Sequence, residues 1–203
     1  MRRGWKRKME TGKIKLVAAD MDGTLLNRDR KITQYTQNVI KKAMAQGVYF
    51  VPATGRAVNA LPPELKEMEG IRYGIFSNGA TIYDLKEEKV IYKNHFEMDR
   101  VLELMDFLKQ FDLMESISLN GQSYANKKEM ENIDYYELDS NTKAIVQGSR
   151  VLVDDLEMFV KEQSTTVEKT TLLFKTMEER RRAADALSKI EAVSYTHLRA
   201  HET

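Results

Sequence analysis

The sequence contains no cysteine, which excludes disulfides and thiolate chemistry and fits a protein of the reducing cytoplasm. It also lacks any apolar run that approaches the roughly 18 residues of a membrane-spanning helix, so we expect no membrane partner. Internal repeats and low-complexity segments are absent as well. The chain is 42% hydrophobic and 31% charged, which is typical of a globular protein. Its 203 residues could form one large domain or two small ones.

Positive charge is concentrated at the N-terminus. The formal net charge of the chain is +1, and it falls to −4 once the five Lys and Arg residues among the first eight are set aside. The rest of the chain therefore offers no basic surface for nucleic acid. The basic segment is either an anion-binding arm or an extension ahead of a start at Met9. We favour the extension and expect residues 1–12 to be disordered, because fold-like patterning begins only at Ile14.

Short apolar runs alternate with helical patterns in the first part of the chain. The runs span residues 14–19, 48–53 and 73–77, and the helical patterns span residues 32–46 and 61–68. This order predicts a Rossmann-like α/β core with a parallel sheet over residues 13–83. The polar residues Asp20, Thr54 and Asn78 each follow one run. Because ligands bind at the carboxyl ends of parallel strands, we expect these side chains to share one crevice.

The pattern changes near Tyr83. We expect a hairpin from residues 81–83 and 90–93, a second hairpin around Asn120-Gly121, helices over residues 98–111, 152–160 and 178–190, and a strand over residues 169–174. Hairpins mixed with helices predict a second, α+β unit over residues 84–192. His95, alone in a polar stretch, is expected to be a surface side chain.

The stretch Asp20-Met21-Asp22-Gly23 carries the clearest chemical signal. It delivers two carboxylates from a strand into a tight turn that Gly23 permits. The two carboxylates repel each other unless a hard cation such as Mg²⁺ neutralises them. One can then attack phosphorus, and the other can protonate the leaving oxygen and activate water. An EF-hand loop is excluded because the glycine comes too early, which leaves a plain acidic turn as the alternative.

Three motifs in this order resemble those of a known family. KLVAADMDGTLL, at residues 15–26, resembles the first motif of the haloacid dehalogenase superfamily of phosphohydrolases. Thr54-Gly55-Arg56 and the segment 77–80 resemble the Cof-like branch, which carries a class IIB cap. The resemblance covers about residues 13–190. It implies that residues 84–192 form an α+β cap domain inserted into an incomplete Rossmann-like core. It implies Mg²⁺-dependent hydrolysis of phosphate monoesters of small metabolites through an aspartyl-phosphate intermediate.

The resemblance assigns roles to the two aspartates. Asp20 would be the nucleophile and Asp22 the general acid and base. The Asp20 carboxylate and the Asp22 backbone carbonyl would bind Mg²⁺.

It also assigns a phosphate site. The Thr54 hydroxyl and the Gly55 amide would hold the phosphoryl group, as phosphoryl transfer requires donors directed at developing negative charge. Arg56 either contacts phosphate or lies on the surface. Asn78 either lines the substrate site, which we favour, or only forms the turn.

The family requires two further motifs after the cap, a lysine and an acidic stretch that completes the metal site, and neither can be placed. Lys169 and Lys175 lie in cap-like sequence. We expect the intact protein to act on a small phosphorylated metabolite, with no obligate protein partner. A phosphomutase is the alternative enzyme, and an inert fragment the alternative to any enzyme. Without a strand after the cap, residues 14–19 should form a sheet edge, and the chain as given should be poorly soluble and inactive.

The last eleven residues, 193–203, require a separate explanation. His197 and His201 are four apart, with Glu202 beside the second, which resembles part of a metal site. However, the segment has no helical or strand period. Its back-translation resembles a transposase-type sequencing-library adapter read in frame, so we expect it to be adapter-derived and to bind no metal.

Deleting residues 193–203 is therefore expected to change neither folding nor metal binding. Calorimetric titration of the full-length and shortened chains with Zn²⁺ checks this expectation. A tight site that is present only with the tail would contradict it.

Overall fold

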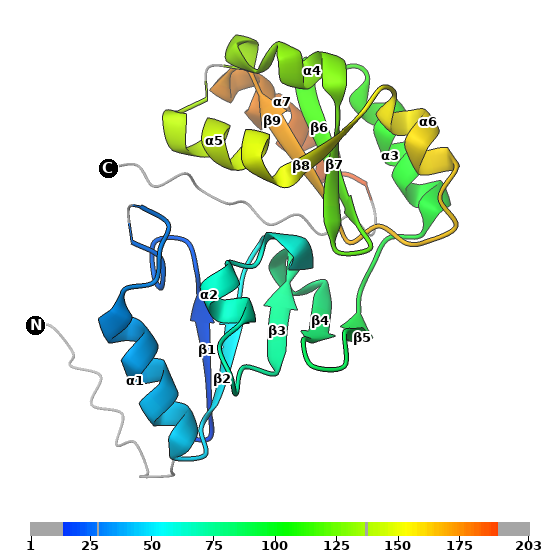
Figure 1. Cartoon of the computed structure of the whole chain (residues 1–203). Coiled ribbons are helices and arrows are strands. Elements are labelled where there is room, and N and C mark those ends of the chain that lie inside the picture. The colour runs from blue at the N-terminus through cyan, green and yellow to red at the C-terminus, as the bar shows by residue number, and fades with distance from the viewer. Residues whose placement is uncertain (1–13, 28, 137, 191–203) are drawn as a thin grey trace, which may run out of the picture.

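The computed structural model describes residues 14–27, 29–136 and 138–190. The expected disordered segment 1–12 and the tail 193–203, with its two histidines, lie outside the described residues. The chain forms two sheets, each with its own helices, and the second sheet lies above one end of the first (Figure 1). No helix in the described ranges is long and apolar enough to cross a membrane.

The first sheet has the strand order β1-β2-β3-β4-β5. Strands β1, β2 and β3 are parallel to one another, while β4 is antiparallel to both β3 and β5. The strands are β1 (Leu16–Asp20), β2 (Tyr49–Ala53), β3 (Tyr73–Phe76), β4 (Thr81–Asp84) and β5 (Lys89–Lys93). The helices are α1 (Gln34–Ala45), η1 (Val58–Ala60), α2 (Pro63–Lys66) and η2 (Ser77–Gly79). The predicted α/β core with a parallel sheet is confirmed.

The second sheet has the order β8-β7-β6-β9 and is mainly antiparallel. Its strands are β6 (Leu113–Leu119), β7 (Gln122–Asn126), β8 (Arg150–Val153) and β9 (Lys169–Phe174). Its helices are α3 (Met98–Leu108), α4 (Lys127–Glu131), η3 (Ile133–Tyr136), α5 (Ser140–Ser149), α6 (Leu156–Lys161) and α7 (Met177–Leu187). Two separate apolar clusters form its core, one with α3 and α6 and the other with α4, η3 and α5.

The hairpin signal at Asn120-Gly121 is confirmed. Both residues have positive φ angles, 49° for Asn120 and 73° for Gly121, as the tight turns that match strand twist require. The turn contacts the first sheet's unit, because the Asn59 amide donates to the Gly121 carbonyl at 2.9 Å. A local turn preference thus fixes one point of contact between the two sheets.

Two sequence expectations differ from the structure. The helix expected over residues 152–160 is wrong in its first part, because residues 150–153 pair with β7 as strand β8. The helix α6 begins after Asp155, whose carboxylate accepts the Met158 amide at 2.8 Å and caps the first turn. The boundary expected near Tyr83 falls inside β4, and the first sheet continues to Lys93.

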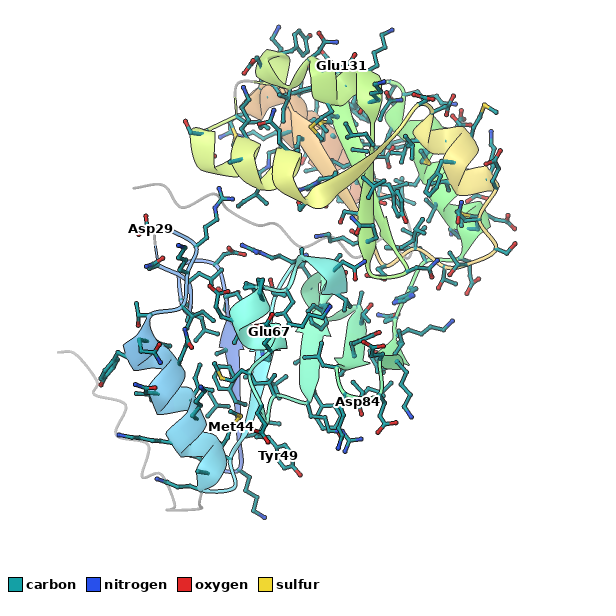
Figure 2. The ribbon with its side chains drawn as sticks, viewed as in Figure 1. Asp29, Met44, Tyr49, Glu67, Asp84 and Glu131 are labelled. Atoms are coloured by element: carbon teal, nitrogen blue, oxygen red, sulfur yellow. The ribbon has the colours of Figure 1, made fainter. Side chains whose placement is uncertain are left out.

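Strand β1 lies at one end of the strand order, so its expected position as an edge strand is confirmed among the described residues. Ile14 is 70% exposed and Leu16 is 55% exposed. Asp84 lies at the end of β4 that points away from the second sheet (Figure 2), and Arg72 pairs with it there at 2.9 Å.

Glu115 is a buried carboxyl in the middle of β6, only 8% exposed, and its Oε1 has no hydrogen-bond partner. Desolvation, followed by the nearby charges of Glu129 and Glu157, raises the pKa of Glu115 to about 7. The folded state therefore holds this proton more tightly than the unfolded chain.

This proton linkage predicts that Glu115 weakens the fold as pH rises from 4.5 to about 7, because the folded state must then bury a charge. Glu115→Gln should remove this slope and stabilise the protein at pH 8 by up to roughly 3 kcal/mol. Urea unfolding of variant and parent across this pH range measures the difference. Glu131→Gln, at an exposed position near the same sheet, is the matched control and should leave the slope unchanged.

Candidate active site

The two aspartates of the first motif lie at the carboxyl end of β1. Met21, between them, is completely buried in the core, while Asp20 and Asp22 are exposed. The amides of Leu25 and Leu26 donate to the Met21 carbonyl at 3.0 and 2.9 Å, which closes the turn. Alternation along the chain therefore anchors the methionine inside and directs both carboxylates outward.

Strand register brings the motifs together. Asp20 pairs with Ala53 of β2, and Ala53 pairs with Ile75 of β3, so the three strands end side by side. A cavity of about 350 Å³ lies at this edge of the sheet. Its lining consists of Asp20, Ala53, Thr54, Gly55, Ile75, Asn78 and Gly79. The structure thus gathers Asp20, Thr54 and Asn78 at one cavity, as expected; their chemical roles stay predictions.

The backbone around Thr54 and Asn78 is tightly specified. Thr54 is 6% exposed, its amide donates to the Ile75 carbonyl at 2.9 Å, and its carbonyl accepts the Asn78 amide at 3.2 Å. Ser77 and Asn78 have φ angles of 51° and 59°, which non-glycine residues rarely adopt. Such strain is typical of functional sites. A Cβ on Gly55 would lie 2.4 Å from the Asn78 side-chain oxygen, so a larger residue here would require the Asn78 side chain to move.

Arg56 is paired with Asp22 in the structure. Its Nε donates to Asp22 Oδ2 at 3.0 Å and its Nη2 to Oδ1 at 2.6 Å, a two-pronged contact. Its Nη1 donates to the Ala60 carbonyl at 3.3 Å. The Arg56 side chain is 19% exposed, so it is not a free surface charge. Asp22, the second residue after β1, and Arg56, the third residue after β2, are thus joined by a contact that the sequence spacing does not reveal.

Lys169 is a residue that the sequence analysis set aside. It begins β9 in the second sheet, and its Nζ donates to the carbonyl of Gly55 beside the cavity. Burial, followed by the charge of Arg150, lowers the pKa of Lys169 to about 8. The contact joins residues 114 positions apart, so no local pattern indicates it.

A second set of contacts joins the two sheets beside the cavity. Glu168 is 4% exposed; its Oε2 accepts the Ser77 hydroxyl at 2.8 Å and its Oε1 accepts the Gly121 amide at 2.7 Å. Because Ser77 directly precedes Asn78, this buried carboxylate connects the second sheet to a residue adjoining the cavity.

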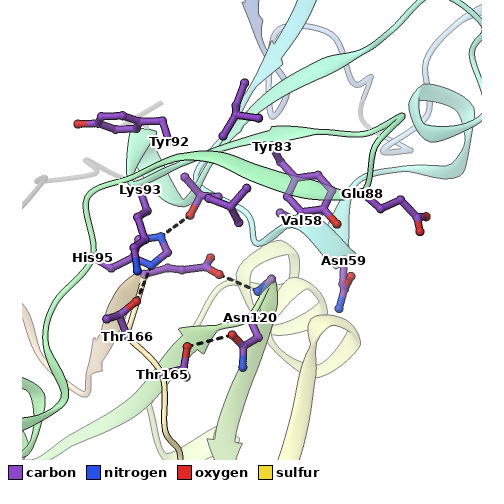
Figure 3. Close-up of a pocket in the computed structure, with 15 residues that line it drawn as sticks. Val58, Asn59, Tyr83, Glu88, Tyr92, Lys93, His95, Asn120, Thr165 and Thr166 are labelled. Atoms are coloured by element: carbon purple, nitrogen blue, oxygen red, sulfur yellow. Dashed lines mark hydrogen bonds between the residues drawn. The ribbon is translucent and has the colours of Figure 1, made fainter.

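The expected surface position of His95 is wrong. Its ring lies between the hydroxyls of Thr81, at 2.8 Å, and Thr166, at 2.9 Å, and it lines a pocket of about 540 Å³ between the sheets (Figure 3). The pKa of His95 is lowered, mainly by burial and further by the charge of Lys93, while the charge of Glu168 opposes this shift. The two hydroxyl partners lie 14 and 71 residues away, which is why the surrounding polar sequence misled the prediction.

The donor atoms at the cavity fit a hard cation. The Asp20 carboxylate accepts the Thr24 hydroxyl at 3.4 Å, and the carboxylate and the Asp22 backbone carbonyl are oxygen donors of the kind that Mg²⁺ prefers. Within the part of the chain that the structure describes, no group of three or more His, Cys, Asp or Glu side chains could hold a metal ion. The metal-binding roles of Asp20 and Asp22 stay predictions.

An α/β core with paired aspartates at the carboxyl edge of its parallel strands, beneath a second α+β sheet, defines the class of this protein. The haloacid dehalogenase-like hydrolase family matches residues 17–196. The chain therefore belongs to that family. The match also includes the first four residues of segment 193–203.

Relatives and solved structures agree with this assignment. The chain is 36% identical over 89 residues to the 5-amino-6-(5-phospho-D-ribitylamino)uracil phosphatase YcsE of Bacillus subtilis, which covers 42% of this chain and 36% of that protein. A haloacid dehalogenase-like hydrolase structure from B. subtilis superposes with a TM-score of 0.71 at 20% identity, covering 88% of this chain and 68% of the other. The subclass IIB sugar phosphatase BT4131 superposes with a TM-score of 0.64 at 20% identity, covering 86% and 64%.

The curated relatives are covered over a smaller share of their length than the solved structures are. The chain spans less than half the length of the curated relatives that it matches, for example 43% and 36%. The structural likenesses at 20% identity show the fold.

Arg56→Met is expected to loosen the turn after β1 with little loss of global stability. Asp22 is 46% exposed, so the pair should contribute about 1 kcal/mol or less to unfolding. Urea unfolding should show this small change, while hydrogen exchange of the amides of residues 22–26 should become faster. Arg100→Met, which breaks an exposed pair within α3, is the control and should leave that exchange unchanged. Unchanged exchange in Arg56→Met would show that the pair does not order the turn.

Proposed function

We propose that the intact protein is a Mg²⁺-dependent phosphatase that hydrolyses phosphate monoesters of small metabolites through an aspartyl-phosphate on Asp20, while the chain as given stays expected to be inactive. The observation that supports this most directly is the single cavity lined by Asp20, Thr54, Gly55 and Asn78. The names of relatives support the same chemistry, since YcsE is a phosphatase and BT4131 a sugar phosphatase. The cysteine-free sequence supports a cytoplasmic location.

In the proposed reaction, the Asp20 carboxylate attacks the phosphorus atom. A P–O bond forms to Asp20 as the P–O bond to the leaving group breaks, and Asp22 gives its proton to the leaving oxygen. Asp22, now a carboxylate, takes a proton from water, which attacks the same phosphorus atom. Inorganic phosphate leaves, and Asp20 and the protonated Asp22 are restored.

The Thr54 hydroxyl and the Gly55 amide would donate to the transferring phosphoryl oxygens. The close packing of Gly55 against Asn78 supports this role, because it fixes the backbone beside the cavity. Asn78 would contact the substrate. Bound to Asp20 and the Asp22 carbonyl, Mg²⁺ would offset the negative charge of the nucleophile and the phosphate.

Arg56 has a conditional role in this proposal. A carboxylate that already accepts two hydrogen bonds from a guanidinium is poorly placed to protonate a leaving group. We therefore propose that Arg56 leaves Asp22 when substrate binds and that its planar fork then contacts two phosphate oxygens. The remainder of the cavity stays in place, because Thr54 is held by backbone bonds.

We also propose that residues after β5 act as a cap. The contacts of Glu168 with Ser77 and of Lys169 with Gly55 support this role. A cap in this position would exclude water and select the substrate's leaving group.

Asp20→Asn should remove nearly all Mg²⁺-dependent turnover of p-nitrophenyl phosphate, because an amide cannot form the acyl phosphate. Asp22→Asn should slow turnover by ~100-fold or more, because the leaving oxygen then lacks its acid. Asp29→Asn, at an exposed position in the same loop region, is the control and should retain activity. Near-normal turnover by Asp20→Asn would rule out the proposed nucleophile.

A further inference from the structure

The second sheet carries a row of four side chains that run straight across it. Arg150 of β8 pairs with Ser123 of β7, Ser123 pairs with Ser118 of β6, and Ser118 pairs with Lys169 of β9. Directly paired residues on neighbouring strands point to the same face of a sheet. The row therefore has a cation at each end, with its outer Cα atoms about 14 Å apart, three strand spacings of ~4.8 Å.

The centre of the row consists of hydroxyl groups. Ser118 Oγ and Ser123 Oγ are hydrogen-bonded to each other at 2.8 Å. Ser118 is 2% exposed, although a serine in the interior of a sheet contributes little apolar burial. Since either hydroxyl can be the donor, the pair can turn a proton toward a ligand that bridges it.

The row lies next to the Asn120-Gly121 turn, at the end of this face that is nearest the candidate active site, while farther along the same face Met114 and Ala125 pack with α4, η3 and α5. Lys169 contacts the Gly55 carbonyl from this face. The strands of the row are also held against the first sheet's unit at their turn, where the Asn59 side chain donates to Gln122 Oε1 at 3.2 Å. A substrate whose phosphoryl group lies beside Gly55 would extend its remaining atoms along this face.

The two cations have no counter-charge in the row. Among the residues that the structure describes, neither Arg150 nor Lys169 has a carboxylate within 4.0 Å. Arg150 Nη1 donates to Ser149 Oγ at 2.8 Å and to the Ile145 carbonyl at 3.4 Å, while its buried Nε has no partner. Glu168 is adjacent in sequence, but its carboxylate accepts from Ser77 and Gly121.

A partly buried cation without a counter-charge is costly, and this cost lowers the pKa of both groups. Desolvation lowers the pKa of Arg150, and desolvation together with Arg150 lowers that of Lys169. An anion placed between them would relieve the cost at both ends, and it would also give the Arg150 Nε an acceptor.

We propose that Arg150, the Ser118–Ser123 hydroxyl pair and Lys169 form a second anion-binding surface that takes a carboxylate or phosphate of the substrate distant from the transferring phosphoryl group. This inference rests on the proposed function, and it defines the substrate class as phosphate monoesters with a second negative charge. The alternative is that both cations only tie the chain together through the carbonyls of Ile145 and Gly55.

Two matched substrate pairs separate these possibilities. The carboxylate pair is 6-phosphogluconate and glucitol 6-phosphate, which differ only at carbon 1. The phosphate pair is fructose 1,6-bisphosphate and fructose 6-phosphate. In each pair, kcat/KM should be about 10- to 100-fold higher for the doubly anionic member, as expected for hydrogen bonds to a charged group. A preference within one pair only identifies which anion the surface takes.

The variant Arg150→Met should reduce this preference at least about threefold and leave the singly anionic member nearly unchanged, because only the added charge uses the surface. Lys169→Met should reduce the preference as well, and it should also slow turnover of both members because it removes the contact with the Gly55 carbonyl. Arg150→Lys should retain part of the preference. Lys161→Met removes a charge from the exposed end of α6 and is the control. Equal losses for both members of a pair in Arg150→Met, or an equal effect of Lys161→Met, would mean that no local anion site exists.

A binding measurement keeps this proposal distinguishable from the proposed function. Calorimetry with Asp20→Asn compares the dissociation constants of the same four compounds without turnover. Failure of the intact protein to hydrolyse any of them would reject the phosphatase proposal, while tighter binding of the doubly anionic members would still support the anion surface. Equal affinities within both pairs would overturn the anion surface, even if hydrolysis occurs and even if a variant fails to fold.

Discussion

The parallel pairing of β1, β2 and β3 is the constraint on which the site depends. Asp20, Ala53 and Ile75 occupy one register row, so the residues that follow them leave the sheet at the same edge. Hydrogen bonds between neighbouring strands fix this row, and this restricts the positions of the side chains that follow it. Fully buried Phe76 and Met21 then hold the ends of two strands in the core. The chemistry at the edge is thereby specified by backbone geometry before any catalytic side chain is considered.

The relation between the two sheets depends on a few buried polar contacts. Glu168 is a carboxylate almost fully removed from water, and its two acceptor oxygens join Ser77 to the turn at Gly121. His95 makes a comparable bridge through two threonine hydroxyls. Such contacts are directional, so they favour one arrangement of the sheets over others that would bury as much apolar area.

Local patterns allowed much of this structure to be predicted from sequence, and long-range contacts account for most of the rest. The strand ends at Asp20 and Thr54 and the Asn120-Gly121 turn follow from short apolar runs and turn chemistry, which act over a few residues. The Arg56–Asp22 pair and the contact of Lys169 with Gly55 join distant segments, and nothing in their neighbouring residues indicates a partner. Strand β8 was misread as helix because its pairing with β7 outweighed a weak local preference.

The alternation at Asp20-Met21-Asp22 also limits how this motif can change during evolution. Met21 is buried completely, and both neighbours face outward. Insertion or deletion of one residue here would exchange the inner and outer faces, placing a carboxylate in the core and a methionine at the cavity. The spacing of the three residues is therefore constrained in addition to their identity. Homologous sequences should therefore align through this segment without gaps, even where the loops on either side vary in length.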